Sequence, residues 1–311
     1  MTAQRTAITL GVAAIATLSI SSCGNKLTTD VAVSAPTTAV TETLAPGVVH
    51  AAFPTGTASG IDIIDVDLQS AAYRPAILTE GLKVEKGRLM GASYTPYDWL
   101  DRSHALAAMN GAYFGTGTDS RKELIGLVVS KGRVIQHAPP LHGKAGTYVR
   151  SAFGINSAGQ PQIVWGATAS KGGPWVYAYS QPTDPHGGYR WNAAEAVGCG
   201  PTLIRSGRKV VTDHEERLVN DISTARTFVA YDVSVGKPVH FVMGIGSRLT
   251  YAELADQVAS YFQRVHGTKV HRAMCLDGGA STQLSYMQNG AIQSPRSTTV
   301  TVPDAIALVH K

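Results

Sequence analysis

Residues 273–286 read AMCLDGGASTQLSY, a short apolar strand that ends in a carboxylate, two glycines and two hydroxyl groups, followed by a second strand-like run. Glycines let the backbone turn with positive φ, and they let a ligand approach closely because they have no Cβ. Asp277 stands at the mouth of this turn and is a candidate catalytic residue. An aspartate in a turn often only hydrogen-bonds its own backbone, so the other motifs must decide between the two interpretations.

The composition is that of a folded protein. The 311 residues suffice for one large domain or two small ones, and 44% hydrophobic with 16% charged residues is ordinary for a soluble fold. The formal net charge of +5 is mild, and no dense run of lysine and arginine occurs. These features do not indicate a nucleic-acid-binding protein.

The N-terminus has the pattern of an export signal. Arg5 precedes an apolar run over residues 8–20, and Ser21, Ser22 and Cys23 follow. The run is too short for a permanent membrane span, and this order is typical of a secretory signal. The ending also resembles the lipobox of bacterial lipoproteins, in which the cysteine is acylated. An ordinary signal peptide with an incidental cysteine is the alternative. We expect residues 1–23 to be a lipoprotein-type signal, and the protein to be exported and anchored at Cys23 to a membrane of the bacterial cell envelope.

Residues 24–59 are rich in Thr, Ala, Ser and Pro and show neither a helical nor a strand period. This composition predicts a disordered linker. The folded domain is then expected to span residues 60–311.

Within residues 60–311, strand patterns outnumber helical ones. Two segments, 124–135 and 200–211, read as β-hairpins around glycine turns, and residues 304–309 predict a closing apolar strand. One long helix is expected over residues 250–266, with Thr250 and Glu253 as a capping box. Because strands and helices do not alternate, we predict a single α+β domain with mixed or antiparallel sheets and one main long helix.

Five motifs occur in a fixed order along the domain: NGAYF (110–114), IGLV (125–128), GPTLIRSG (200–207), ART (225–227) and LDGGAS (276–281). Taken together, they resemble the phosphodiester glycosidase family. The chain departs from the family pattern at Ala280, where a third glycine is usual, and at Ala112-Tyr113, where Gly-Phe is usual. These changes concern the choice of substrate more than the fold.

The resemblance implies hydrolysis of a sugar-1-phosphodiester, with an N-acetylglucosamine-like sugar, in envelope or extracellular glycans. It implies Asp277 as base or nucleophile, and Arg226 as the residue that holds phosphate oxygens with paired, charge-assisted hydrogen bonds. Asn110 and Ser281 are expected to position sugar or phosphate oxygens. The expected substrate contacts are Gly278, Gly279, Tyr113, Gly200 and Thr202.

A second carboxylate is usual in glycoside hydrolysis, which proceeds through an oxocarbenium-like transition state. Glu195, Asp213, Glu215 and Glu216 all lie in predicted loops, and nothing in the sequence selects one of them. No cofactor is identified. A divalent ion remains an option because Asp277 and the nearby hydroxyls offer oxygen ligands, although their spacing does not match a calcium loop.

Cys199 and Cys275 each lie within two residues of a motif. In an exported chain they are candidates for a disulfide that would brace the site, and two buried thiols are the alternative.

Two other functional classes compete with the hydrolase. A glycan-binding envelope lipoprotein on the same fold would lack turnover. A serine hydrolase using Ser281 would need a Gly-x-Ser-x-Gly or Ser-x-x-Lys motif, which residues 279–283 do not provide. Nucleotide binding is not supported, because no glycine-rich phosphate loop leads from a strand into a helix.

Overall fold

The computed structural model describes residues 40–55, 59–138, 149–168, 175–183, 188–218 and 222–311. The predicted signal, Cys23 and the first part of the predicted linker lie outside these ranges. Within them, no helix has the length and apolar character needed to cross a membrane.

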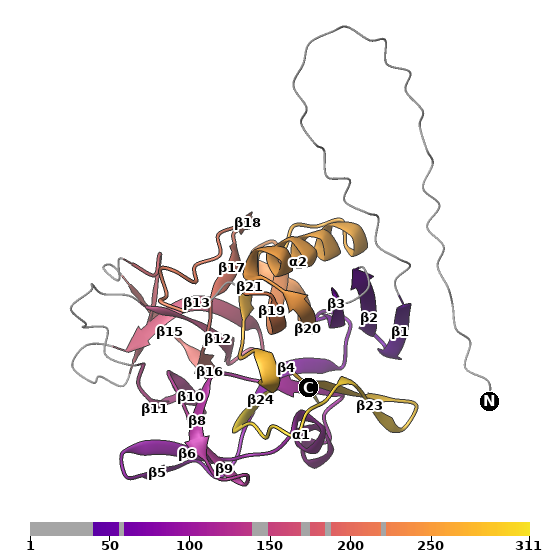
Figure 1. Ribbon diagram of the computed structural model, residues 1–311. Helices are drawn as coiled ribbons and strands as arrows, with labels where there is room; N and C mark the ends of the chain where they lie inside the picture. Colours follow the sequence, from indigo (N-terminus) through magenta and orange to yellow (C-terminus); the bar gives the residue numbers. More distant parts are fainter. Residues whose placement is uncertain (1–39, 56–58, 139–148, 169–174, 184–187, 219–221) are drawn as a thin grey trace, which may run out of the picture.

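Four β-sheets make up most of the described structure, and every strand pairing within them is antiparallel (Figure 1). The largest has eight strands in the order β1 (Val40–Ala45), β2 (Val48–Thr55), β3 (Ser59–Asp67), β20 (Lys237–Leu249), β19 (Thr224–Ser234), β21 (Arg272–Cys275), β17 (Thr202–Arg205) and β18 (Arg208–Lys209). The seven-stranded sheet has the order β11 (Arg133–Gln136), β10 (Val128–Ser130), β16 (Ala193–Gly198), β12 (Arg150–Asn156), β13 (Pro161–Thr168), β14 (Val176–Tyr179) and β15 (Tyr189–Trp191).

Two smaller sheets complete the fold. The five-stranded sheet has the order β23 (Ala291–Arg296), β22 (Leu284–Gln288), β7 (Ala107–Asn110), β24 (Asp304–His310) and β4 (Tyr73–Thr79). The four-stranded sheet has the order β5 (Lys83–Glu85), β6 (Arg88–Ala92), β9 (Arg121–Leu124) and β8 (Phe114–Gly117). The helical elements of the described chain are α1 (Pro96–Ser103), α2 (Tyr251–Val265) and the short 3-10 helix η1 (Gly279–Ser281).

The predicted α+β class is therefore only partly right, since the described chain is mostly β, while its antiparallel sheets agree with one of the two predicted arrangements. The helix prediction itself is confirmed. Thr250 accepts a hydrogen bond from the Glu253 amide, and the Glu253 carboxylate accepts one from the Thr250 amide, so the capping box is present. The capping box made this helix recognisable in the sequence. Short strands between glycine turns have too few residues to show a clear alternation of apolar and polar side chains.

The linker prediction is wrong for residues 40–55. These residues form β1 and β2, and β2 pairs with β3 along its whole length, from Val48 opposite Val66 to Thr55 opposite Ser59. Val48, Ala51 and Phe53 are buried. Because the segment is rich in threonine and alanine, its strands were not predicted, although threonine is favourable in a half-buried strand.

The main hydrophobic core lies between the three larger sheets. It joins Met109 of β7, Phe153 of β12, Phe241 of β20 and Ile306 of β24. A second core lies under α2, where Leu254, Val258 and Phe262 pack against the outer face of the eight-stranded sheet (Figure 1). The sheets therefore meet along the ends of β7, β21 and β24.

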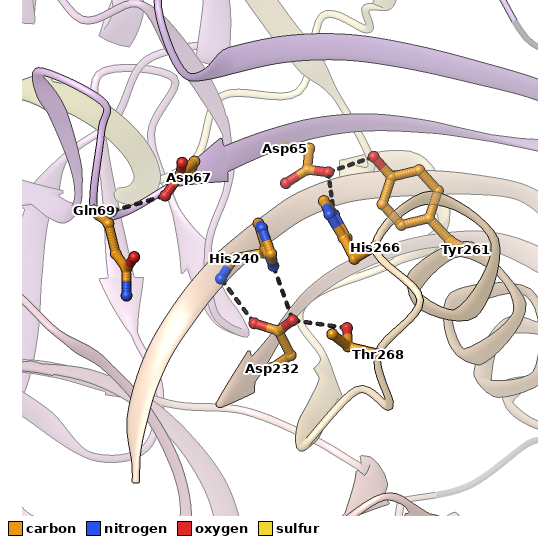
Figure 2. A network of polar contacts seen from close by, with 8 residues as sticks. All are labelled: Asp65, Asp67, Gln69, Asp232, His240, Tyr261, His266 and Thr268. Atoms are coloured by element: carbon orange, nitrogen blue, oxygen red, sulfur yellow. Dashed lines mark hydrogen bonds and ion pairs between the residues drawn. The ribbon is translucent and has the colours of Figure 1, made fainter. Parts of the chain in front are cut away.

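A polar network fastens the C-terminal end of α2 to that sheet (Figure 2). The His266 ring pairs with Asp65 of β3 at 2.7 Å, and the Tyr261 hydroxyl donates to the same carboxylate oxygen at 2.5 Å. The His240 ring pairs with Asp232 of β19 at 2.8 Å. The two imidazoles stack with their centroids 3.7 Å apart. Each buried carboxylate of this network thus has an imidazole partner.

Candidate active site

The glycine turn that follows β21 lies where two sheets meet. The Leu276 amide donates to the Thr227 carbonyl of β19 at 2.8 Å, and the Asp277 amide donates to the Gly111 carbonyl at 3.1 Å. Gly279 has φ of 64°, the left-handed region that favours glycine. The eight-stranded sheet thus supplies Asp277, and the segment after β7 in the five-stranded sheet holds its backbone.

Asp277 is half-buried and has no histidine, lysine or arginine as an ion-pair partner among the described residues. Its Oδ1 accepts a hydrogen bond from the Gly278 amide at 3.0 Å, and its side chain is also hydrogen-bonded to Ser281. Burial raises the pKa of Asp277 to about 6, against the lowering effect of these two bonds. The carboxyl is therefore ionised at neutral pH and is a strong enough base to accept a proton.

Asn110 makes its hydrogen bonds inside the protein, and its predicted contact with substrate stays a prediction. The side chain is fully buried, and its amide donates to the Asp277 carbonyl at 2.8 Å. Its Oδ1 accepts from the Thr227 hydroxyl at 2.8 Å and from the Gln283 amide at 3.1 Å. The amide nitrogen and Oδ1 of Asn110 thus both bond groups inside the protein, and they hold the turn at Asp277 and at Gln283.

Asp304, at the start of β24, is the site carboxylate that the sequence did not reveal. The Gly111 amide donates to its carbonyl at 3.2 Å, and the Ala112 amide donates to its Oδ2 at 3.0 Å. Its Oδ1 is buried without a hydrogen-bond partner among the described residues. Burial raises the pKa of Asp304 to about 7; the bond from Ala112 opposes this rise, and the charge of Asp277 adds to it. The only signal in the sequence was one acidic residue at the head of a closing apolar strand.

Arg226 lies behind the turn. A Cβ at Gly278 would lie 4.0 Å from the Arg226 Cα, so the Arg226 backbone lies beside the turn. The guanidinium donates to the carbonyls of Leu249 and Ile222 at 3.1 and 2.6 Å and lies over the Tyr251 ring at 3.7 Å. The side chain is buried and held firmly, and its predicted contact with phosphate stays a prediction.

Arg296 of β23 is a second arginine at the turn, and it was not predicted. Its Nε donates to the Thr282 carbonyl at 2.8 Å and its Nη2 to the Gly279 carbonyl at 3.4 Å. It is half-buried. Through these two bonds Arg296 holds the backbone of the turn.

The remaining predicted contacts fall into two groups. The Tyr113 hydroxyl donates to the Gly200 carbonyl at 2.8 Å, so this aromatic and the Gly-Pro turn form one unit next to the Asp277 turn. Thr202 is buried, with its hydroxyl 2.5 Å from that of Ser151 and its amide bonded to Glu216 at 3.0 Å. Thr202 therefore belongs to a buried polar network, and its predicted contact with substrate stays a prediction.

The four carboxylates considered for the second catalytic role do not contact the Asp277 turn in the described structure. Glu216 is fully buried and accepts hydrogen bonds from Ser151, Thr202, Thr212 and Trp165. Burial raises the pKa of Glu216, against the lowering effect of these bonds. Glu195 accepts from the Ile77 amide at 3.0 Å. Asp213 is buried and Glu215 is exposed.

The candidate disulfide is not present, and the alternative of two buried thiols applies. Cys199 and Cys275 are both buried and both present as thiols. Burial raises the pKa of Cys199 well above its ordinary value, so this thiol stays protonated. As for metals, the described residues contain no cluster of three or more histidine, cysteine, aspartate or glutamate side chains that suits an ion.

The site thus combines a half-buried carboxylate at a glycine turn, a second carboxyl group behind Gly111, and two arginines that bond backbone carbonyls. Carboxyl groups serve glycoside hydrolysis, and guanidinium groups bind phosphate oxygens. The comparisons with known proteins agree with this class. Residues 103–309 match the family model described as phosphodiester glycosidase, and the chain belongs to that family.

Two solved structures share the fold. One is the catalytic domain of zebrafish N-acetylglucosamine-1-phosphodiester alpha-N-acetylglucosaminidase, auto-inhibited by its pro-peptide, at 18% identity over 81% of this chain and 77% of that one, with a TM-score of 0.50. The other is a hypothetical protein from Synechocystis, at 17% identity over 85% of this chain and 62% of that one, with a TM-score of 0.50. None of the curated proteins matches this chain.

Proposed function

We propose that this protein hydrolyses the glycosidic bond of a sugar-1-phosphodiester, and that Asp277 acts at the anomeric carbon. The observation that carries the proposal is the state of Asp277, a half-buried carboxylate at the glycine turn whose pKa burial raises to about 6. The turn lies inside the region that matches the family.

In this reaction the bond between the anomeric carbon and the phosphate oxygen breaks, and water supplies the new hydroxyl on the sugar. Ionised Asp277 either attacks the anomeric carbon or takes the proton from the attacking water. The leaving phosphomonoester is a weak base, so it needs little protonation from an acid. It does need its negative charge held, and guanidinium groups hold phosphate oxygens well.

Arg226 and Arg296 are the candidates for holding that charge. Arg226 lies behind the turn and Arg296 lies along its outer edge, where it already donates to the Gly279 carbonyl. Ser281 keeps the Asp277 carboxylate in one orientation through their hydrogen bond. Gly279 leaves open space beside the turn, because a Cβ there would meet no atom within 4 Å, whereas Gly278 lies against the Ala225 carbonyl.

For the substrate and its location, we propose an N-acetylglucosamine-like sugar phosphodiester in the cell envelope or outside the cell. The support is the family match, together with the signal and lipobox pattern that ends at Cys23. Replacing Cys23 with serine and following incorporation of a fatty-acid analogue tests the anchor. Equal labelling of both forms would remove the lipid from the proposal.

The decisive experiment measures sugar release from an N-acetylglucosamine-1-phosphodiester by the protein and by Asp277→Asn, each with and without a chelator. Release by the parent alone supports the reaction and the role of Asp277, and sensitivity to chelator would add a metal requirement. If the folded parent released no sugar from a panel of sugar phosphodiesters yet bound glycans, the non-catalytic glycan-binding lipoprotein would replace this proposal.

A further inference from the structure

The carboxyl group of Asp304 has unusual surroundings beside the Asp277 turn. Asp304 is 1% exposed, and no lysine, arginine or histidine of the described chain forms an ion pair with it. One oxygen accepts the Ala112 amide, while the other has no partner among the described residues. An ionised carboxylate in such surroundings is costly, because nothing replaces the water it has lost.

Gly111 connects this carboxyl group to Asp277. Its amide donates to the Asp304 carbonyl at 3.2 Å, and its carbonyl accepts from the Asp277 amide at 3.1 Å. A Cβ at Gly111 would lie 2.3 Å from Asp304 Oδ2, so the carboxyl group lies directly against this peptide. The two aspartates thus lie on either side of one glycine, and the charge of Asp277 raises the pKa of Asp304.

We infer that Asp304 is a positioning residue that works as a neutral carboxylic acid, with its proton on Oδ1, and thereby leaves Asp277 as the single charge of the site. Oδ2 already accepts the Ala112 amide, so the proton belongs on the other oxygen. A second negative charge behind Gly111 would oppose the charge on Asp277 and would release the segment that holds its backbone. This inference rests on the proposed hydrolase function for its kinetic consequence only.

The other titratable groups near this carboxyl do not interfere in the relevant pH range. Asp277 approaches from the end of β21, Cys199 from the end of β16 and Tyr113 from the segment after β7. Burial raises the pKa of both Cys199 and Tyr113 well above their ordinary values, so neither ionises near neutral pH. The described site therefore contains two groups, Asp277 and Asp304, that titrate between acid and mildly alkaline conditions.

Asp304→Asn tests the inference because it copies the neutral acid. The amide oxygen accepts the Ala112 amide as Oδ2 does, and the NH2 group takes the place of the O–H. For the parent we expect a bell-shaped pH profile of kcat/KM, in which ionisation of Asp277 sets the acid limb and ionisation of Asp304 the alkaline limb. In Asp304→Asn the alkaline limb should move up by about one pH unit or more, while activity at the optimum is kept within about threefold.

Glu195→Gln is the matched control, since Glu195 also accepts one backbone amide but lies apart from the Asp277 turn. Its alkaline limb should coincide with that of the parent. An alkaline limb that is the same in the parent and in Asp304→Asn would overturn the inference. So would loss of activity at every pH in an Asp304→Asn protein that is folded.

A second readout does not depend on turnover. The melting temperature of the parent should fall between pH 5.5 and pH 8.5 relative to that of Asp304→Asn, because the folded chain must give up a proton it holds tightly. Parallel melting curves for the two proteins would refute the inference even if no substrate is cleaved. Conversely, melting curves that diverge in the absence of any sugar release would support the neutral Asp304 and contradict only the proposed hydrolase function.

Discussion

Two groups of buried aspartates in this protein differ in what surrounds them. Asp65 and Asp232 each pair with an imidazole, at 2.7 and 2.8 Å, and the two rings stack on each other. Asp277 and Asp304 receive only amide and hydroxyl hydrogen bonds, and one oxygen of Asp304 receives none among the described residues. The first group fastens helix α2 to its sheet, and the second lies at the glycine turn.

The difference extends to the pKa values of the two groups of aspartates. The hydrogen bond to Asp232 raises the pKa of His240, and despite burial the pKa of Asp232 itself is lowered, so the pair is stabilised in its charged form. Burial instead raises the pKa of Asp277 to about 6 and of Asp304 to about 7. Carboxyl groups kept near neutrality in this way are suited to proton transfer, and they cost stability when ionised.

The comparison is tested most strongly by exchanging Asp277 and Asp65 for asparagine. Asp277→Asn should lower sugar release by about 10²–10⁴-fold, as expected for loss of a catalytic base. It should melt slightly higher than the parent at pH 7.5, because the raised pKa makes the ionised carboxylate destabilising there.

Asp65→Asn should do the opposite. It removes the charged partner of His266 and Tyr261, and we expect a loss of about 1–3 kcal/mol in the free energy of unfolding. Turnover per folded molecule should stay at the level of the parent. A stable, active Asp277→Asn together with an inactive, folded Asp65→Asn would reverse the assignment of the two groups.

Gly111→Ala should have the next largest effect. The added Cβ would lie 2.3 Å from Asp304 Oδ2, so either the carboxyl group or the Asn110–Tyr113 segment must move. We expect a destabilisation of about 1–3 kcal/mol, measured by denaturant unfolding, together with loss of turnover. Gly166→Ala is the control, because its Cβ would meet no atom closer than 3.4 Å. Equal unfolding free energies for the two variants would mean that Asp304 does not lie against Gly111 in solution.

Arg226→Lys tests whether the guanidinium behind the turn holds phosphate. We expect affinity for a non-hydrolysable sugar phosphodiester to fall about 10- to 100-fold, because paired hydrogen bonds to a charged oxygen are lost. Affinity for the free sugar should change little, as measured by calorimetry with both ligands. If both affinities fell equally, Arg226 would only support the turn, and Arg296 would become the first candidate for the phosphate.

The smallest expected effect is that of His240→Asn, which keeps a hydrogen-bond donor near Asp232 but cannot be charged. The pKa of His240 is raised in the folded state, so its stabilisation is complete at acid pH and is lost as the pH rises through that raised value. The variant should melt a few degrees below the parent at pH 5.5, with the difference shrinking toward pH 9. A difference that grows with pH would contradict the charged His240–Asp232 pair.

Local patterns allowed the turn of Asp277 and the helix α2 to be predicted. The strand, the carboxylate and the glycines are adjacent in the chain, and the capping box of Thr250 and Glu253 lies within one turn. Burial of a polar side chain has no such local signature. Asn110 and Thr202 were therefore expected to face a ligand, although both make their hydrogen bonds inside the protein.

Asp304 could not be recognised for a different reason. Its contact with Ala112 joins residues 192 positions apart, and it exists only because β24 pairs with β7. The strands β1 and β2 were missed in the same way, since their place in the sheet depends on β3 and not on their own threonine-rich composition. The two cysteines each lie within two residues of a motif but remain thiols. Sequence spacing does not give the geometry that a disulfide requires.

The position of β24 affects the order in which the protein is synthesised and folds. This strand lies between β7 and β4 in its sheet, yet every other described strand precedes it in the chain. A ribosome therefore makes Asp304 after all the partners of its sheet, and until then β7 and β4 each present an open edge. Closing such long-range pairs is slow compared with forming local hairpins. The site of the nascent chain is therefore not assembled until synthesis has passed His310.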